Sequence, residues 1–175
     1  AAVYGVLRAL EDSGRARRGY FVAGLGAAQF ALPGAVDRLR SFRSSTGASQ
    51  TNGVDESHAG SLMLAATDPA QPYGAALAWP TASTAGARPQ RAAGAFVVLD
   101  DGEPAAYLER GGRTVITFAA PERWVDPLTH LVKDGRLRQL ELTTIDEVPV
   151  RDSPPAPALR AAGFRDTYRG LVLRG

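Results

Sequence analysis

The strongest constraint on the fold is a set of three apolar runs separated by short glycine-containing turns. The runs cover residues 96–99, 105–108 and 115–118, and Asp101-Gly102 and Gly111-Gly112 lie between them. Such dipeptides are typical of two-residue hairpin turns, whose central residues need positive φ angles. The pattern predicts an antiparallel meander in the middle of the 175-residue chain.

The sequence around this meander predicts further strands and two short helices. We expect a strand at 62–66, a helix that begins at Pro121 or Asp126-Pro127 and ends at Gly135, strands within 140–145, a helix between Ser153 and Gly163, and a final strand at 164–173, bent at Gly170. The predicted class is α+β. Residues 61–175 are expected to form a mostly antiparallel, β-barrel-like domain, which would bury one apolar face and protect its edges.

The first part of the chain has a different pattern. Its elements are a helix with Val3, Val6, Leu7 and Leu10 on one face, a hairpin within residues 17–32, and a helix opened by Pro33. This order, with arginines on the first strand, is typical of the last half of a winged-helix module, which we place at residues 1–43. Residues 44–60 have almost no apolar side chains and predict a linker or mobile loop.

The sequence lacks the residues of several common sites. It has no cysteine, no GxxxxGK[ST] phosphate loop, no GxSxG serine motif and no complete GxGxxG. Its histidines, His58 and His130, do not have metal-binding spacing. No apolar run is long enough to span a bilayer. We expect a fragment of a larger cytoplasmic protein, with no metal or cofactor in this part.

Lys133 is the only lysine, and several of the arginines gather where nucleic acid could bind. The candidates early in the chain are Arg15, Arg17, Arg18 and Tyr20 at the predicted hairpin and Arg88 and Arg91 in a polar loop. Arginine grips phosphates bidentately. The alternatives are a strand edge protected by charge and solvated loop residues. Trp79 and Trp124 could stack on single-stranded bases, although their apolar surroundings favour core packing.

The final predicted strand carries a second candidate group. Strand alternation would place Arg165 and Arg169 on one face and Asp166 on the other, together with Phe164 and Tyr168. An aspartate desolvated by aromatic rings would have a raised pKa and could be catalytic. The alternative, which we favour, is a solvated carboxylate or one paired with an arginine.

Several segments resemble the C-terminal region of the large helicase-related (Lhr-type) DNA helicases of bacteria. They are RRGYFVAGLGAAQFALPGAVDRLR (17–40), LAATDPAQPYGAALAWP (64–80), RAAGAFVVLDDGEPAAYLERGGRTVITF (91–118) and AAGFRDTYRGLVLRG (161–175). The resemblance implies winged-helix modules and a β-barrel that follow an ATP-dependent motor linked to DNA repair. ATP and Mg²⁺ would bind that motor, whose Walker motifs are not in this sequence.

The same region is similar in architecture to bacterial DNA glycosylases of the AlkZ type. These use a Gln-x-Gln or Gln-x-Asp motif to position water at a flipped nucleotide. Gln29-Phe30-Ala31 keeps the first glutamine but has alanine at the second polar position. Asp166 is therefore the candidate catalytic carboxylate if the chain excises bases.

The main hypothesis is a non-catalytic module that binds single-stranded or tailed DNA and helps assembly. A DNA glycosylase module is the first alternative. The second is an oligomerisation or docking module with an exposed apolar patch around Tyr73 and Trp79.

Overall fold

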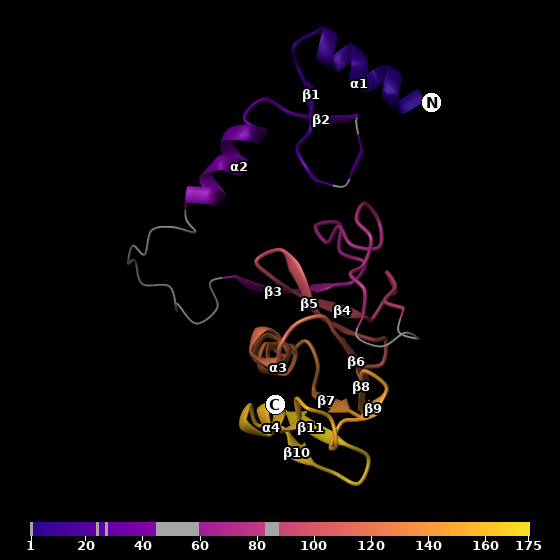
Figure 1. Cartoon of the computed structure of the whole chain (residues 1–175), viewed down its shortest axis with the longest axis vertical. Coiled ribbons are helices and arrows are strands. Elements are labelled where there is room, and N and C mark those ends of the chain that lie inside the picture. Colours follow the sequence, from indigo (N-terminus) through magenta and orange to yellow (C-terminus); the bar gives the residue numbers. More distant parts are fainter. Residues whose placement is uncertain (1, 24, 27, 45–59, 83–87) are drawn as a thin grey trace. The chain divides into compact units, whose positions relative to one another are not determined.

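The computed structural model describes residues 2–23, 25–26, 28–44, 60–82 and 88–175. The chain divides into two compact units, Ala1–Val54 and Asp55–Gly175, drawn in Figure 1 from indigo to purple and from magenta to yellow. Residues 45–59, which make up most of the predicted linker, lie outside the described residues.

The first unit consists of a helix, a hairpin and a second helix, as predicted: α1 (Ala2–Asp12), β1 (Arg17–Gly19), β2 (Gln29–Ala31) and α2 (Ala35–Ser44). Gly14, with a φ angle of 72°, ends the first helix. The two strands are antiparallel, with Arg17 opposite Ala31. Pro33 does not open α2 as expected, because Gly34 adopts a φ angle of 84°, which is outside the helical range.

The second unit contains a six-stranded sheet in the order β3-β4-β5-β6-β8-β9. Its strands are β3 (Ser61–Ala65), β4 (Phe96–Asp100), β5 (Glu103–Leu108), β6 (Thr114–Thr117), β8 (Thr144–Ile145) and β9 (Val148–Pro149). The predicted meander is confirmed as β4-β5-β6. Asp101 and Gly102 have φ angles of 50° and 84°, as a primed hairpin turn requires.

A second sheet of three strands has the order β10-β11-β7, with β7 (Gln139–Leu142), β10 (Arg165–Asp166) and β11 (Leu171–Arg174). The prediction of one long final strand was therefore wrong. The chain reverses between β10 and β11, where the Thr167 amide donates to the Gly170 carbonyl at 2.8 Å. Two antiparallel strands replace the single bent one.

The six-stranded sheet is open rather than barrel-like, so that part of the fold prediction is corrected. Among the described strands, no pairing joins β3 to β9. After β6 the chain leaves this sheet through η2 (Pro121–Arg123) and α3 (Val125–Lys133), and β7 joins the second sheet instead. The α+β class with mostly antiparallel strands is confirmed.

The core of the second unit is built around α3. Trp124 has no exposed surface (0%) and donates from its indole Nε1 to the Ala119 carbonyl at 3.3 Å. Its core neighbours come from α3, β7 and β11 and from α4 (Ala156–Ala161). The core interpretation of Trp124 is confirmed, and so are both predicted helices. The helix α3 begins one residue before Asp126-Pro127.

Candidate nucleic-acid interface

Asp166, the last residue of β10, forms an ion pair with Arg160. Its carboxylate accepts two hydrogen bonds from the Arg160 guanidinium, at 2.9 and 3.0 Å. The Arg151 Nε lies 4.0 Å from the Asp166 Oδ1, one of the two oxygens that accept from Arg160. Arg160 is on α4, which Gly163 ends with a φ angle of 104°, so that the chain turns back and β10 begins close to the end of the helix.

The ion pair favours the ionised form of Asp166. Its pKa lies below the ordinary value, because Arg160 hydrogen-bonds to the ionised carboxylate and the charges of Arg160 and Arg151 add to this. The alternative with a raised pKa was wrong. Phe164 is buried while Tyr168 is 82% exposed, so the two rings do not desolvate the carboxylate.

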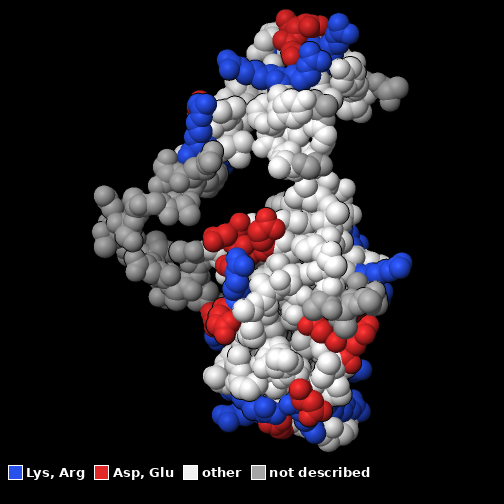
Figure 2. Space-filling model, in the orientation of Figure 1, with Lys and Arg blue, Asp and Glu red and all other residues white. Residues whose placement is uncertain are grey.

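Exposed arginines surround this carboxylate. We use the name hairpin surface for Arg151, Arg160, Arg165, Asp166, Tyr168 and Arg169, all of which are exposed. Figure 2 shows blue side chains, with a few red ones among them, gathered at the end of the second unit where Figure 1 places α4, β10 and β11. Four cations and one anion give this surface a positive balance, which attracts a phosphate backbone.

The first unit also carries exposed arginines. Arg15, Arg17 and Arg18 are exposed, and Tyr20 is 80% exposed. The Arg18 guanidinium lies 3.4 Å from Glu11 and donates to the Tyr4 hydroxyl at 3.5 Å. Arg18 therefore ties β1 to α1, and part of its charge is balanced within the unit.

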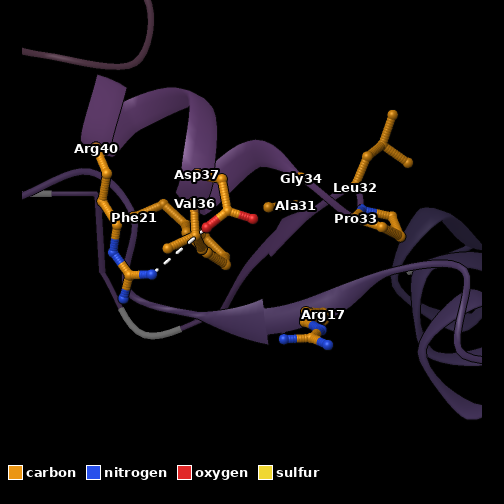
Figure 3. A pocket seen from close by; sticks show the side chains of 9 residues that line it. All are labelled: Arg17, Phe21, Ala31, Leu32, Pro33, Gly34, Val36, Asp37 and Arg40. Atoms are coloured by element: carbon orange, nitrogen blue, oxygen red, sulfur yellow. Dashed lines mark hydrogen bonds and ion pairs between the residues drawn. The ribbon is translucent and has the colours of Figure 1, made fainter. Parts of the chain in front are cut away.

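A small hollow of about 220 Å³ lies between the hairpin and α2 of the first unit. Figure 3 shows Arg17 on one side of it, while Asp37 and Arg40 approach each other on α2. Their nearest atoms are 3.5 Å apart. Phe21, Val36 and Pro33 supply apolar lining. The lining of the hollow includes two arginines and one aspartate, a smaller positive balance than that of the hairpin surface.

Gln29, the residue that matches the first glutamine of the glycosylase motif, is used inside its own hairpin. Its Oε1 accepts from the amides of Phe21 and Val22, each at 2.8 Å, and its Nε2 donates to the carbonyls of Val22 and Gly26 at 2.8 and 3.1 Å. These bonds use both donors and both acceptor positions of the amide. Gln29 therefore holds the loop that follows β1.

Replacing Gln29 with alanine is expected to loosen this loop. Four hydrogen bonds are lost, and the net loss is about 2 kcal/mol of local stability. Hydrogen exchange at the Phe21 and Val22 amides should become about 30-fold faster. Replacement with glutamate keeps the acceptor and should protect these two amides better than alanine does. Unchanged exchange in the alanine variant would contradict this role.

The two loop arginines that the sequence predicts to bind nucleic acid, Arg88 and Arg91, differ in their contacts. Arg91 donates to three backbone carbonyls, including that of Asp68 at 3.0 Å, and so holds a loop together. Arg88 is exposed.

Trp79 packs with Tyr73 and Tyr107, with ring centroids 6.0 and 5.5 Å away. Tyr73 is only 7% exposed, so the exposed apolar patch expected around Tyr73 and Trp79 was wrong.

Sequence reasoning missed the residues that complete the hairpin surface. Arg151 and Arg160 belong to no motif, and only the reversal of the chain after α4 brings them to Asp166. Within the described residues there is no group of three or more metal-ligating side chains. Nor does that part of the chain contain a helix long and apolar enough to cross a membrane.

Residues 1–51 match the family model of the winged-helix domain of the large helicase-related protein. A Mycolicibacterium smegmatis protein named "Lhr helicase/ probable uracil glycosylase" is 47% identical over 186 aligned residues, which cover 99% of this chain and 12% of the relative. An Escherichia coli K12 protein named "Lhr helicase/uracil glycosylase" is 41% identical over 170 residues, or 94% of this chain and 10% of the relative. The chain thus spans about a tenth of the length of these relatives.

Proposed function

Because the chain belongs to the Lhr-type helicases, as part of their C-terminal region, we propose that it binds DNA and takes part in the excision of uracil. We therefore favour the hypothesis of a DNA glycosylase module over that of a module that only binds DNA. The observation that carries the proposal is the alignment. Two proteins whose names include uracil glycosylase match nearly the whole chain.

The hairpin surface is the part of the chain whose chemistry suits this reaction best. Breaking the bond between uracil N1 and the sugar C1′ sends the bonding electrons to uracil and leaves positive charge on the sugar, as in other glycoside cleavages. The oxygen of a water molecule then bonds to C1′, and the proton that this water loses neutralises the departing uracil anion. The ionised Asp166 carboxylate, whose pKa Arg160 lowers, would stabilise that charge and orient the attacking water. The surrounding arginines would bind the phosphates on either side of the uracil nucleotide.

Excision by this route needs no nucleotide hydrolysis. We propose that ATP and Mg²⁺ serve only a motor outside this sequence, so that the chain contributes DNA contacts and base removal to a helicase active in repair. Assembly into oligomers is a separate hypothesis, which the solution mass of the chain tests against its monomer mass of 18.4 kDa.

The proposal is tested on single-stranded DNA that carries one uracil, without ATP, followed by alkaline cleavage of abasic sites. The assay uses the full-length natural protein that contains this sequence. We expect a cleavage product that falls about 100-fold or more in Asp166→Asn. Asp152→Asn, which alters another exposed carboxylate of the second unit, is the matched control. A wild-type protein that binds this DNA but releases no uracil would reduce the function to passive binding.

The pKa of Asp166 gives a separate pH prediction. The ordinary pKa of an aspartate lies below pH 5, and Arg160 lowers the pKa of Asp166 further, so the carboxylate is ionised throughout the range from about pH 5 to 8. The ratio of the wild-type excision rate to the Asp166→Asn rate should therefore be constant across that range. A ratio that changes tenfold or more between its ends would mean that the pKa of Asp166 is raised, which would contradict the lowering by Arg160.

A further inference from the structure

Tyr168 stands at the tip of the β10–β11 turn with its ring in solvent. It is 82% exposed, the highest value among the large apolar side chains that the structure describes. A tyrosine ring in water leaves most of its apolar area uncovered. An isolated exposed tyrosine needs no explanation, but the backbone that carries this one is firmly held.

Several contacts fix the turn. The Thr167 amide donates to the Gly170 carbonyl at 2.8 Å, and the Gly170 amide donates to the Thr167 hydroxyl at 3.2 Å. Gly170 is buried against β7, where a Cβ atom would lie 2.0 Å from the Leu142 carbonyl oxygen. On the other side of the turn, Arg160 holds Asp166 by two hydrogen bonds. The turn is therefore anchored at both ends.

The charges next to the ring indicate the kind of partner. The Arg169 guanidinium lies 5.0 Å from the centre of the Tyr168 ring, and Arg165 is exposed on the adjoining strand. An aromatic ring beside arginines matches the alternation of flat bases and phosphates along a single strand. An apolar protein surface would leave these guanidinium groups without anions.

We propose that Tyr168 stacks on a nucleobase of single-stranded DNA while Arg165 and Arg169 bind the flanking phosphates. The inference rests on the proposed DNA binding and adds the residue that contacts a base. Stacking on a side chain whose backbone is already held in place costs less ordering entropy than stacking on one in a mobile loop. It also tolerates any base, because every base has a π-face. Tyr168 would thus hold the strand near the uracil nucleotide without reading its sequence.

The test compares two oligonucleotides of about 12 nucleotides, one of deoxythymidine and one with the same phosphates but abasic sugars. The dissociation constants of the wild-type chain, Tyr168→Ala and Tyr168→Phe are measured at one salt concentration. We expect Tyr168→Ala to weaken deoxythymidine binding about tenfold and to leave abasic binding unchanged. Tyr168→Phe, which keeps the ring, should bind like the wild type.

Arg169→Ala is the contrasting variant and should weaken both oligonucleotides, because each has the same phosphates. Equal losses on the two oligonucleotides in Tyr168→Ala, or no loss on either, would overturn the stacking role while DNA binding stands. A phenylalanine variant as weak as alanine would overturn it too. A wild-type chain that binds neither oligonucleotide would overturn both this inference and the proposed function.

Discussion

The Gly170→Ala variant is expected to lose about 3 kcal/mol or more of the free energy of unfolding of the second unit. A Cβ atom at this position would lie 2.0 Å from the Leu142 carbonyl oxygen and 3.1 Å from Val150. Backbone atoms cannot move aside as the end of a flexible side chain can. The variant must therefore separate β11 from β7, whose pairing joins Leu171 to Leu142.

Urea unfolding followed by the fluorescence of Trp79 and Trp124, both in the second unit, measures this loss. Gly102→Ala is the matched control, since its φ angle of 84° is unfavourable for alanine but nothing lies within 4 Å of the added carbon. That variant should lose only about 1 kcal/mol. Similar losses for both variants would contradict the close approach of Gly170 to β7.

The double variant Arg165→Ala/Arg169→Ala is expected to bind single-stranded DNA about 25-fold more weakly at about 0.1 M salt. Each phosphate contact releases about 0.7 of a counterion from a single strand, which is worth about fivefold in affinity at that salt concentration. The slope of log affinity against log salt should become shallower by about 1.4. Binding isotherms at several salt concentrations measure both quantities.

Arg110→Ala/Lys133→Ala is the charge-matched control for this variant. Both side chains are exposed, and they belong to the β5–β6 turn and to α3. Because the control removes the same two positive charges, any general effect of net charge is equal in the two proteins. An equal fall in affinity for both variants would mean that the net charge of the protein determines its affinity for DNA. It would contradict the assignment of the hairpin surface as the binding site.

Local patterns in the sequence predicted the elements that depend on local chemistry. The Asp101-Gly102 turn and the apolar runs on either side of it specify a hairpin through their own dihedral angles and alternation. Trp124 was assigned to the core because its apolar neighbours recur at helical spacing. In each case the determining residues lie within a few positions of one another.

The features that were missed depend on contacts between distant segments. No residue near Gly170 in the sequence indicates that this glycine lies against the Leu142 carbonyl. The reversal of the chain between β10 and β11 was therefore predicted as a bend in one strand. Whether the six-stranded sheet closes into a barrel depends on which strand β7 pairs with. Because α3 lies between β6 and β7 in the chain, residues near β7 do not specify that partner. The same holds for the candidate site. Asp166 was identified as a candidate from the sequence, but its ion-pair partner Arg160 was not, because only the reversal of the chain after α4 brings the two together.

The hairpin surface is the face of the chain that we propose binds DNA. Amide hydrogen exchange of the chain, with and without a uracil-containing single strand, maps that face without any substitution. We predict that exchange slows most at residues 165–170, with a smaller effect near Arg151. Unchanged exchange across the β10–β11 turn, with slowing confined to β3 and α3 or to the first unit, would contradict the claim.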